Sequence, residues 1–190
     1  IFGMSINRIF DVNIDKKNPR TSNRGLISGN ILFKEAYAIA LISLSIFYLI
    51  IINFNINALY LSPIVIILFL IYPLTKRFTF LCHYFLGLVY LIAPPAVEIA
   101  LTGKFSLETL FLGISGFFWV SGFDLIYAIL DIDFDKKNKI HSIPSKFGIK
   151  ITKFLAFISH LITLIFILSI GLIINLNPIY WFGCTIIILL

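Results

Sequence analysis

The amino-acid sequence predicts an all-α protein that crosses a membrane several times as a helical bundle. Of its 190 residues, 59% are hydrophobic and only 13% are charged, and the mean hydropathy is +1.02. An average soluble domain carries roughly 25% charged residues, so a water-soluble globule of this size could not cover so much apolar surface. Disorder is excluded as well, because disordered chains are poor in apolar residues. The chain is therefore expected to be an integral membrane protein.

Five apolar runs have about the length that a membrane-spanning helix needs. A bilayer core about 30 Å thick is crossed by roughly 20 apolar residues. Polar turns are predicted at residues 53–57 and 175–178, and Pro94-Pro95 is expected to interrupt the third span. The predicted spans are Ala36–Asn53, Ala58–Tyr72, Tyr84–Leu101, Leu107–Leu130 and Phe154–Ile174, and a further run covers Pro178–Leu190.

The basic residues predict which side of the membrane each loop faces. Fourteen of the fifteen Lys and Arg residues lie in the first segment and in the loops after the second and fourth spans. Lys104 alone lies on the other side. The positive-inside rule therefore puts the three basic segments in the cytoplasm. This topology explains most of the net charge of +6, so nucleic-acid binding is not needed to account for it.

The six aspartates fall in two clusters, both on the predicted cytoplasmic side. Asp11 and Asp15 follow Asn7 at spacing i, i+4, i+8, which puts the three on one face of a helix. The second cluster also shares one helix face, at spacing i, i+3, i+7, i+11, and consists of Asp124, Tyr127, Asp131 and Asp135. Asp133 points away from this face and is interpreted as solvated.

Carboxylate clusters of this kind predict binding of a hard cation. Mg²⁺ takes oxygen ligands and is typically held by one or two carboxylates together with substrate phosphates. Two clusters that face each other could hold Mg²⁺ and a diphosphate between them. The basic residues beside the clusters are the expected donors to the diphosphate, namely Arg20, Arg24, Lys76, Arg77 and Lys139. Acids and bases on one membrane face suggest a site for a charged head attached to an apolar tail.

Three stretches of the chain resemble the UbiA superfamily of intramembrane aromatic prenyltransferases. The run N-R-I-F-D-V-N-I-D-K-K-N-P-R-T-S-N-R (Asn7–Arg24) is similar to the family's first Asp-rich motif, and D-L-I-Y-A-I-L-D-I-D-F-D (Asp124–Asp135) to its second. The run Y-P-L-T-K-R-F-T (Tyr72–Thr79) resembles a loop of the family, and Lys136–Gly148 is typical of the segment after the second motif. Three long motifs in the right order make a specific signal.

The resemblance implies roles for individual residues. It implies that Mg²⁺ and the diphosphate are held by Asn7, Asp11, Asp15, Asp131 and Asp135, with support from Asp124. The positions implied to line the diphosphate and the reacting centre are Arg20, Arg24, Tyr72, Lys76 and Tyr127. The residues with an implied catalytic role are Asp11, Asp15, Asp131, Asp135, Tyr72 and Tyr127.

The resemblance also implies an architecture. It implies nine transmembrane helices around a central cavity open to the cytoplasmic side, with residues 1–190 forming one transmembrane prenyltransferase domain. The chain is expected to begin near the end of the family's second helix and to stop within the eighth. It is thus expected to lack the first and last family helices.

The implied activity is that of the 4-hydroxybenzoate polyprenyltransferase type of quinone biosynthesis. A polyprenyl group would pass from an allylic diphosphate to a small aromatic acid, with Mg²⁺ as cofactor, in ubiquinone or menaquinone biosynthesis. The protein would be a multi-pass protein of the bacterial inner membrane whose active site faces the cytoplasm.

Other membrane proteins bind cations through carboxylates, and two classes compete with this interpretation. The first is a transporter or ion-translocating protein, which is expected to carry its carboxylates near mid-membrane on broken helices in matching halves. Here the acids cluster with Lys and Arg at one predicted edge of the membrane. The second is a phosphatidyltransferase, whose D-G-x-x-A-R run does not occur in this sequence.

Overall fold

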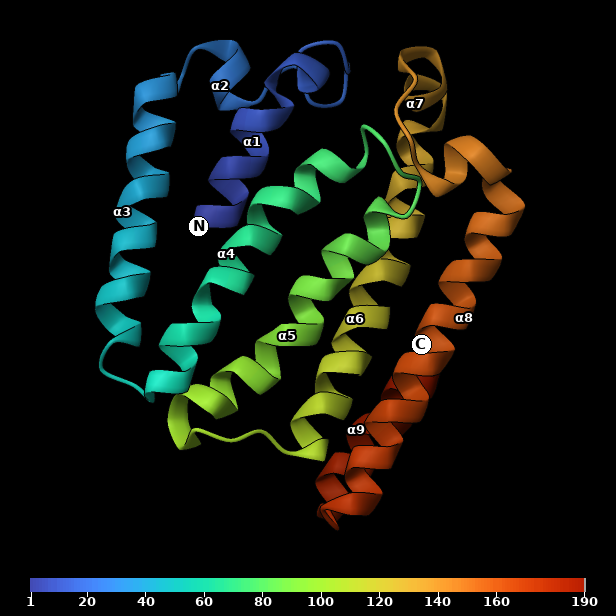
Figure 1. Cartoon of the computed structure of the whole chain (residues 1–190). Coiled ribbons are helices and arrows are strands. Elements are labelled where there is room, and N and C mark those ends of the chain that lie inside the picture. The colour runs from blue at the N-terminus through green and yellow to red at the C-terminus, as the bar shows by residue number, and fades with distance from the viewer. Residues whose placement is uncertain (190) are drawn as a thin grey trace.

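The computed structural model describes residues 1–189, and this part of the chain contains helices and no strand (Figure 1). A 3₁₀ turn, Ile129–Asp131, connects α6 to α7. The helices are α1 (Phe2–Asp15), α2 (Gly25–Ser28), α3 (Phe33–Ile51), α4 (Ile56–Thr75), α5 (Cys82–Thr102), α6 (Leu107–Ala128), α7 (Ile132–Asn138), α8 (Ile143–Ile173) and α9 (Pro178–Leu189).

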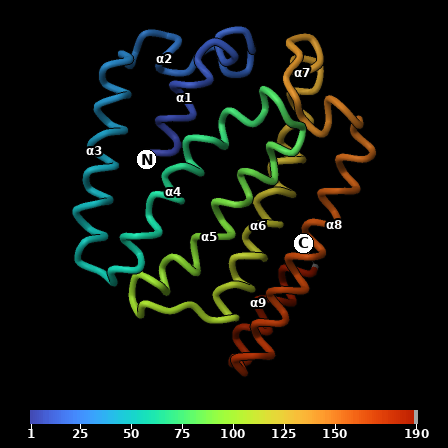
Figure 2. Tube along the Cα trace, viewed as in Figure 1, coloured from blue at the N-terminus to red at the C-terminus, as the bar shows by residue number. Residues whose placement is uncertain are grey.

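The chain runs back and forth between the two ends of one bundle, as Figure 2 shows. The loop before α2, the loop between α4 and α5, and helix α7 gather at one end, while the turn that contains Lys104 lies at the other (Figure 1). The predicted multi-span, all-α class is confirmed, because five helical segments are long and apolar enough to cross a membrane. They are Phe33–Ile51, Ile56–Thr75, Cys82–Thr102, Leu107–Asn138 and Ile143–Ile173.

Many of the most deeply buried side chains are small or hydroxyl-bearing, and many large apolar side chains face outward. Thr152 and Thr163 are almost completely buried, whereas Phe157 between them on α8 is 64% exposed. The hydroxyl of Thr152 donates to the carbonyl of Gly148 one turn earlier. In a bilayer the driving force for helix packing is close contact of small residues rather than burial from water. This inside-out distribution therefore fits a bundle surrounded by lipid.

Helices α5 and α6 cross in close contact because glycines line their interface. A Cβ atom on Gly113 would lie 2.2 Å from the carbonyl oxygen of Leu91, and one on Gly87 would lie 2.3 Å from the hydroxyl of Ser121. A side chain at either position would force the two backbones apart. The crossing matters for the site described below, because both helices contribute residues to its wall.

The expectation that Pro94-Pro95 interrupts the third span is wrong. Helix α5 continues through both prolines to Thr102, and α4 likewise contains two prolines. Prolines are tolerated in membrane helices because neighbouring groups satisfy the backbone atoms that they leave unpaired. The span consequently keeps its full length.

Helix α8 begins earlier than the predicted span Phe154–Ile174. Ser142 is its N-cap, with a side-chain oxygen that accepts from the backbone N–H of Ser145, and a proline occupies the first turn. Serine at the N-cap and proline in the first turn are strong helix-start signals. The first turns of α8 bend away at Gly148, whose φ of 80° is in the left-handed region. The loop after α7 is therefore short and held against the bundle.

Candidate functional site

Helix α1 presents the first acidic stretch. Asp11 and Asp15 are both buried, with 3% and 6% of their surface exposed. Both lie on α1, and Asn7 precedes them on the same helix face, as predicted. The side-chain amide of Asn7 donates to the hydroxyl of Tyr72 on α4 at 2.5 Å. Packing against α4 therefore fixes the direction in which this face points.

The second acidic stretch does not lie on one regular helix. Helix α6 ends at Ala128, and the 3₁₀ turn then tightens the chain before α7 begins. Asp135 on α7 is buried and accepts a hydrogen bond from the hydroxyl of Ser142 at 2.7 Å. Asp133 is exposed, which confirms that it points away from the predicted face. The turn therefore changes the helical register but leaves Asp135 directed inward.

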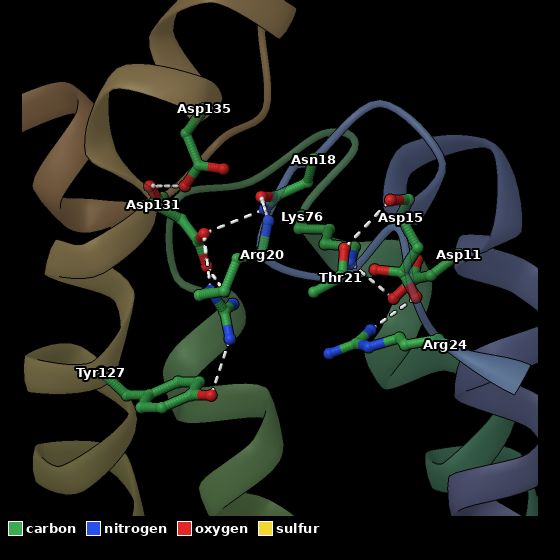
Figure 3. A network of polar contacts seen from close by, with 11 residues as sticks. Asp11, Asp15, Asn18, Arg20, Thr21, Arg24, Lys76, Tyr127, Asp131 and Asp135 are labelled. Atoms are coloured by element: carbon green, nitrogen blue, oxygen red, sulfur yellow. Dashed lines mark hydrogen bonds and ion pairs between the residues drawn. The ribbon is translucent and has the colours of Figure 1, made fainter. Parts of the chain in front are cut away.

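Both acidic stretches line one cavity of about 260 Å³ at the end of the bundle where the loops gather. Figure 3 shows Asp131 and Asp135 on one side and Asp11 and Asp15 on the other, with Lys76 and Arg20 between them. The predicted site residues that line the cavity are Asn7, Asp11, Asp15, Arg20, Arg24, Tyr72, Lys76, Asp124, Tyr127, Asp131 and Asp135. Segments that are distant in the sequence therefore form one polar cavity.

Three aspartates of this cavity are each paired with a basic side chain (Figure 3). The Lys76 ammonium lies 2.5 Å from Asp11 Oδ2. An equal distance joins Arg24 Nη1 to Asp15 Oδ2. Such charge-assisted pairs are strong when they are shielded from water, and here both carboxylates are almost fully buried. The acids and bases therefore offset one another inside the cavity.

Arg20 connects the loop after the first acidic stretch to the second stretch. Its guanidinium donates to both carboxylate oxygens of Asp131, with Nε at 3.0 Å from Oδ1. Its Nη1 donates to the hydroxyl of Tyr127 at 2.6 Å, and its Cζ lies 4.8 Å from the centre of that ring. The hydrogen bond to Asp131 raises the pKa of the Arg20 guanidinium, so this side chain stays charged. Arg20 thus links the loop after α1 to the second acidic stretch.

Asn18 is a cavity residue that sequence reasoning missed. Its side-chain amide donates to Asp131 Oδ1 at 2.9 Å, and its carbonyl oxygen accepts from the backbone N–H of Arg20 at 3.0 Å. The turn-forming pair Asn18-Pro19 directly after α1 is the only sequence signal for it. Asn18 therefore holds the loop in the conformation that lets Arg20 reach Asp131.

The donor set suits a hard divalent cation. The Oδ1 atom of Asp11 is buried and has no hydrogen-bond partner among the described residues, although Oδ2 of the same carboxylate contacts Lys76. Burial raises the pKa of this carboxyl, and Lys76 opposes the shift. A buried carboxylate oxygen without a partner is costly, and an ion or its bound water would satisfy it. Within residues 1–189 no three His, Cys, Asp or Glu side chains already converge as a metal site.

Asp124 faces the same cavity but is engaged by a histidine. The Nδ1 atom of His83 on α5 lies 2.7 Å from Asp124 Oδ2 on α6. The backbone N–H of Ile143 points at Nε2 of the same ring at 3.4 Å, so Nε2 accepts and Nδ1 donates to the carboxylate. His83 is thus part of the cavity wall, outside the motifs that the sequence analysis singled out.

Two predicted diphosphate-binding residues, Arg77 and Lys139, lie outside this cavity. The Arg77 guanidinium donates to the backbone carbonyl of Phe10 at 2.6 Å. Lys139 follows α7 at its C-cap, where the chain turns toward Ile140. Both line a neighbouring pocket of about 320 Å³ that shares Lys76 with the cavity. Both residues are exposed, so closeness to the motifs in the sequence did not place their side chains in the cavity.

Comparison with known proteins places this arrangement in a family context. The model of the UbiA prenyltransferase family matches residues 1–190. A 4-hydroxybenzoate octaprenyltransferase of Shewanella piezotolerans is 36% identical over 146 residues, which are 77% of this chain and 51% of that protein. The protein of the same name from Pseudoalteromonas translucida is 29% identical over 188 residues, which are 99% of this chain and 64% of that protein. The chain spans about half to two thirds of these relatives' length.

A solved structure has the same fold. The apo structure of a UbiA homolog from Aeropyrum pernix K1 superposes with a TM-score of 0.92 and 32% sequence identity. The match covers the whole of this chain and 73% of that chain. The arrangement of the helices is therefore shared with this homolog.

Proposed function

Because the chain belongs to the UbiA prenyltransferase family, we propose that the protein transfers a polyprenyl group from an allylic diphosphate to an aromatic acceptor. The acceptor is a 4-hydroxybenzoate-like acid, and the product enters ubiquinone or menaquinone biosynthesis. Relatives that share 29–36% of their aligned residues with this chain are named 4-hydroxybenzoate octaprenyltransferases, which supports this choice. Mg²⁺ is the proposed cofactor.

One observation carries the proposal: two acidic stretches from different parts of the chain line a single cavity together with basic side chains. A diphosphate needs positive charge around its oxygens, and a divalent cation needs carboxylates. The cavity offers both, since Arg20, Arg24 and Lys76 lie among the aspartates. It also lies at the end of helices long enough to cross a membrane, where an attached polyprenyl tail can enter lipid.

We assign the binding roles as follows. Asn7 and the aspartates of both stretches hold Mg²⁺ and the diphosphate, and the buried free oxygen of Asp11 is the first candidate ligand. Bound Mg²⁺ supplies charge that stabilises the departing diphosphate. Arg20, Arg24 and Lys76 donate to the diphosphate oxygens when the substrate draws them from their carboxylates. Asp124, which is held by His83, supports the second stretch from the wall.

The reaction is an electrophilic aromatic substitution. The allylic C–O bond breaks, the bonding electrons leave with the diphosphate, and an allylic cation remains. The rings of Tyr72 and Tyr127 line the cavity, and their negatively polarised faces stabilise such a cation. The aromatic acceptor then forms the new C–C bond and loses one proton. The cavity offers two groups to accept this proton, a carboxylate of the second stretch and the released diphosphate.

The proposed location is the bacterial inner membrane, with the cavity facing the cytoplasm. The loops around the cavity carry nearly all the Lys and Arg residues, and Lys104 lies in the turn at the opposite end. The positive-inside rule orients such a bundle with the cavity end in the cytoplasm. The allylic diphosphate and the aromatic acid, both anions, then reach the site from the aqueous side.

The test uses the full-length protein in membranes, supplied with Mg²⁺, allylic diphosphates of several chain lengths and a panel of aromatic acids. We expect a prenylated aromatic product that disappears when EDTA removes the metal and returns when Mg²⁺ is added. Product formation that is insensitive to EDTA would contradict the metal assignment. Ion flux into liposomes without any prenylated product would instead favour the transporter alternative.

A further inference from the structure

A second pocket, with basic and apolar residues in its wall, lies beside the cavity. Its polar lining consists of Asn13, Lys17, Lys76, Arg77, Asn138 and Lys139, and its volume is about 320 Å³. Four residues belong to both walls, namely Ile14, Lys76, Phe134 and Ile140. We refer to this space as the outer basic pocket.

The charge balance of the outer basic pocket differs from that of the cavity. Its lining contains four basic residues and no Asp or Glu. In the described part of the chain, Lys17, Arg77 and Lys139 have no carboxylate within ion-pairing distance, whereas the cavity's Arg20 and Arg24 each have one. Unneutralised cations in a concave site attract multivalent anions strongly. The pocket therefore has the chemistry of a phosphate site.

The Arg77 side chain is held by the backbone, and the Lys139 backbone adopts a conformation unusual for a lysine. The Arg77 guanidinium donates one N–H group to the carbonyl of Phe10, and its remaining N–H groups are available to a ligand. Lys139 has a φ of 55°, in the left-handed region where glycine is favoured. The turn itself needs only a backbone that tolerates this conformation, so a glycine would serve it at least as well. The lysine side chain adds charge that the fold does not require.

We propose that the outer basic pocket is a second anion site, which takes inorganic pyrophosphate released from the cavity on its way to solvent. This inference rests on the proposed function, because pyrophosphate is the leaving group of that reaction. Lys76 acts as the shared contact, since its ammonium can bind an anion on either side. No bond is made or broken in this step, and the pyrophosphate carries the charge of the broken C–O bond with it.

The experiment measures binding of radiolabelled inorganic pyrophosphate to the full-length protein in phosphatidylcholine nanodiscs. An allylic thiodiphosphate, which does not react, is added to saturation so that it fills the cavity. We expect one pyrophosphate per chain to remain bound. The variant Lys17→Gln/Lys139→Gln should bind it at least about tenfold more weakly, whereas Lys16→Gln/Lys150→Gln, which removes the same charge from exposed positions outside the pocket, should bind it as the wild type does.

Loss of all pyrophosphate binding once the cavity is filled would overturn the second site, and so would equal affinities of the two double variants. A thiodiphosphate that displaces no pyrophosphate at all would instead contradict the proposed function of the cavity. Lys139→Gly separates charge from fold, because it should weaken pyrophosphate binding without lowering the melting temperature. A lower melting temperature with unchanged binding would show that Lys139 is purely structural.

Phospholipid headgroups carry the same phosphate chemistry and provide a final arm. The binding measurement is repeated in nanodiscs enriched in phosphatidylglycerol. Pyrophosphate binding that persists there supports a site for the free anion. Binding abolished by phosphatidylglycerol would assign the pocket to a lipid headgroup and overturn the pyrophosphate proposal.

Discussion

His83 Nδ1 lies 2.7 Å from Asp124 Oδ2, and this pair joins α5 to α6 inside the wall of the cavity. The imidazole is buried, while the carboxylate remains about one-third exposed on the cavity side. Because the other ring nitrogen accepts from the backbone of Ile143, the ring is held from both sides. Asp124 is thereby fixed in direction, although it is the aspartate nearest the apolar part of α6.

Replacing His83 should therefore reduce activity through Asp124. His83→Ala leaves the carboxylate without its partner, and we expect a loss of about 1–3 kcal/mol in unfolding free energy and about 10- to 100-fold in kcat/KM. His83→Asn offers a side-chain N–H in place of Nδ1 and should restore part of both. Prenyl transfer and thermal unfolding in detergent measure the two effects. An Ala variant with wild-type values in both assays would show that the pair has no role.

An aspartate that lines the cavity should be separable from one that lies outside it. Asp11→Asn keeps the shape of the side chain but removes a negative charge, and we expect kcat to fall by about 100-fold or more. Asp133→Asn removes the same charge from an exposed position and should leave both kcat and the Mg²⁺ requirement as they are. Titration of activity with Mg²⁺ checks both variants. Equal losses in the two variants would point to net charge rather than ligation.

Tyr127 should act through its ring more than through its hydroxyl. Tyr127→Phe loses the hydrogen bond from Arg20 but keeps the aromatic face, and we expect a decrease in kcat of less than about tenfold. Tyr127→Leu removes the face, worth about 2 kcal/mol toward a desolvated cation, which corresponds to roughly 30-fold in rate. Single-turnover prenyl transfer compares them. If Phe is as damaging as Leu, the hydroxyl and its contact with Arg20 dominate.

The close crossing of α5 and α6 should tolerate no side chain at Gly113. A Cβ there meets the backbone of Leu91, so Gly113→Ala should destabilise the bundle by about 1–3 kcal/mol. Gly116→Ala lies one turn further along α6, where the new methyl group would be 3.5 Å from Tyr90 in ordinary contact. This control should keep or slightly raise stability, because alanine is the better helix former. Melting temperatures of both variants in the same detergent decide the comparison.

Much of the fold could be predicted from the sequence because lipid imposes a simple constraint. A span must be long, apolar and helical, so the five runs were recognisable by their length and apolar character. The family resemblance of the motifs is confirmed. Helical spacing also placed Asn7, Asp11 and Asp15 on one face. The interruption at Pro94 was predicted wrongly, because propensities measured in water overstate what proline does inside a packed membrane helix.

The details of the site depend on contacts that spacing does not encode. The 3₁₀ turn before α7 changes the register of the second stretch, and no residue pattern in Ile129–Asp131 marks it. Asn18 reaches Asp131 only because the loop after α1 folds across the cavity. Arg77 turned outward because the carbonyl of Phe10 lies within its reach. The contacts of Asn18 and Arg77 depend on partners distant in the sequence, and local sequence patterns do not identify such partners.

The pairing of Lys76, Arg24 and Arg20 with aspartates has a thermodynamic consequence. Without ligands, three of the five aspartates that line the cavity are paired with Arg20, Arg24 and Lys76. An anion that binds Lys76 must first break the ion pair between Lys76 and Asp11. The carboxylate of Asp11, left without its partner, then attracts a cation. We therefore expect the affinities for the proposed anion and the proposed cation to be linked, with binding of each increasing the affinity for the other by the same factor. The cavity should therefore favour binding of the anion and the cation together over binding of either one alone.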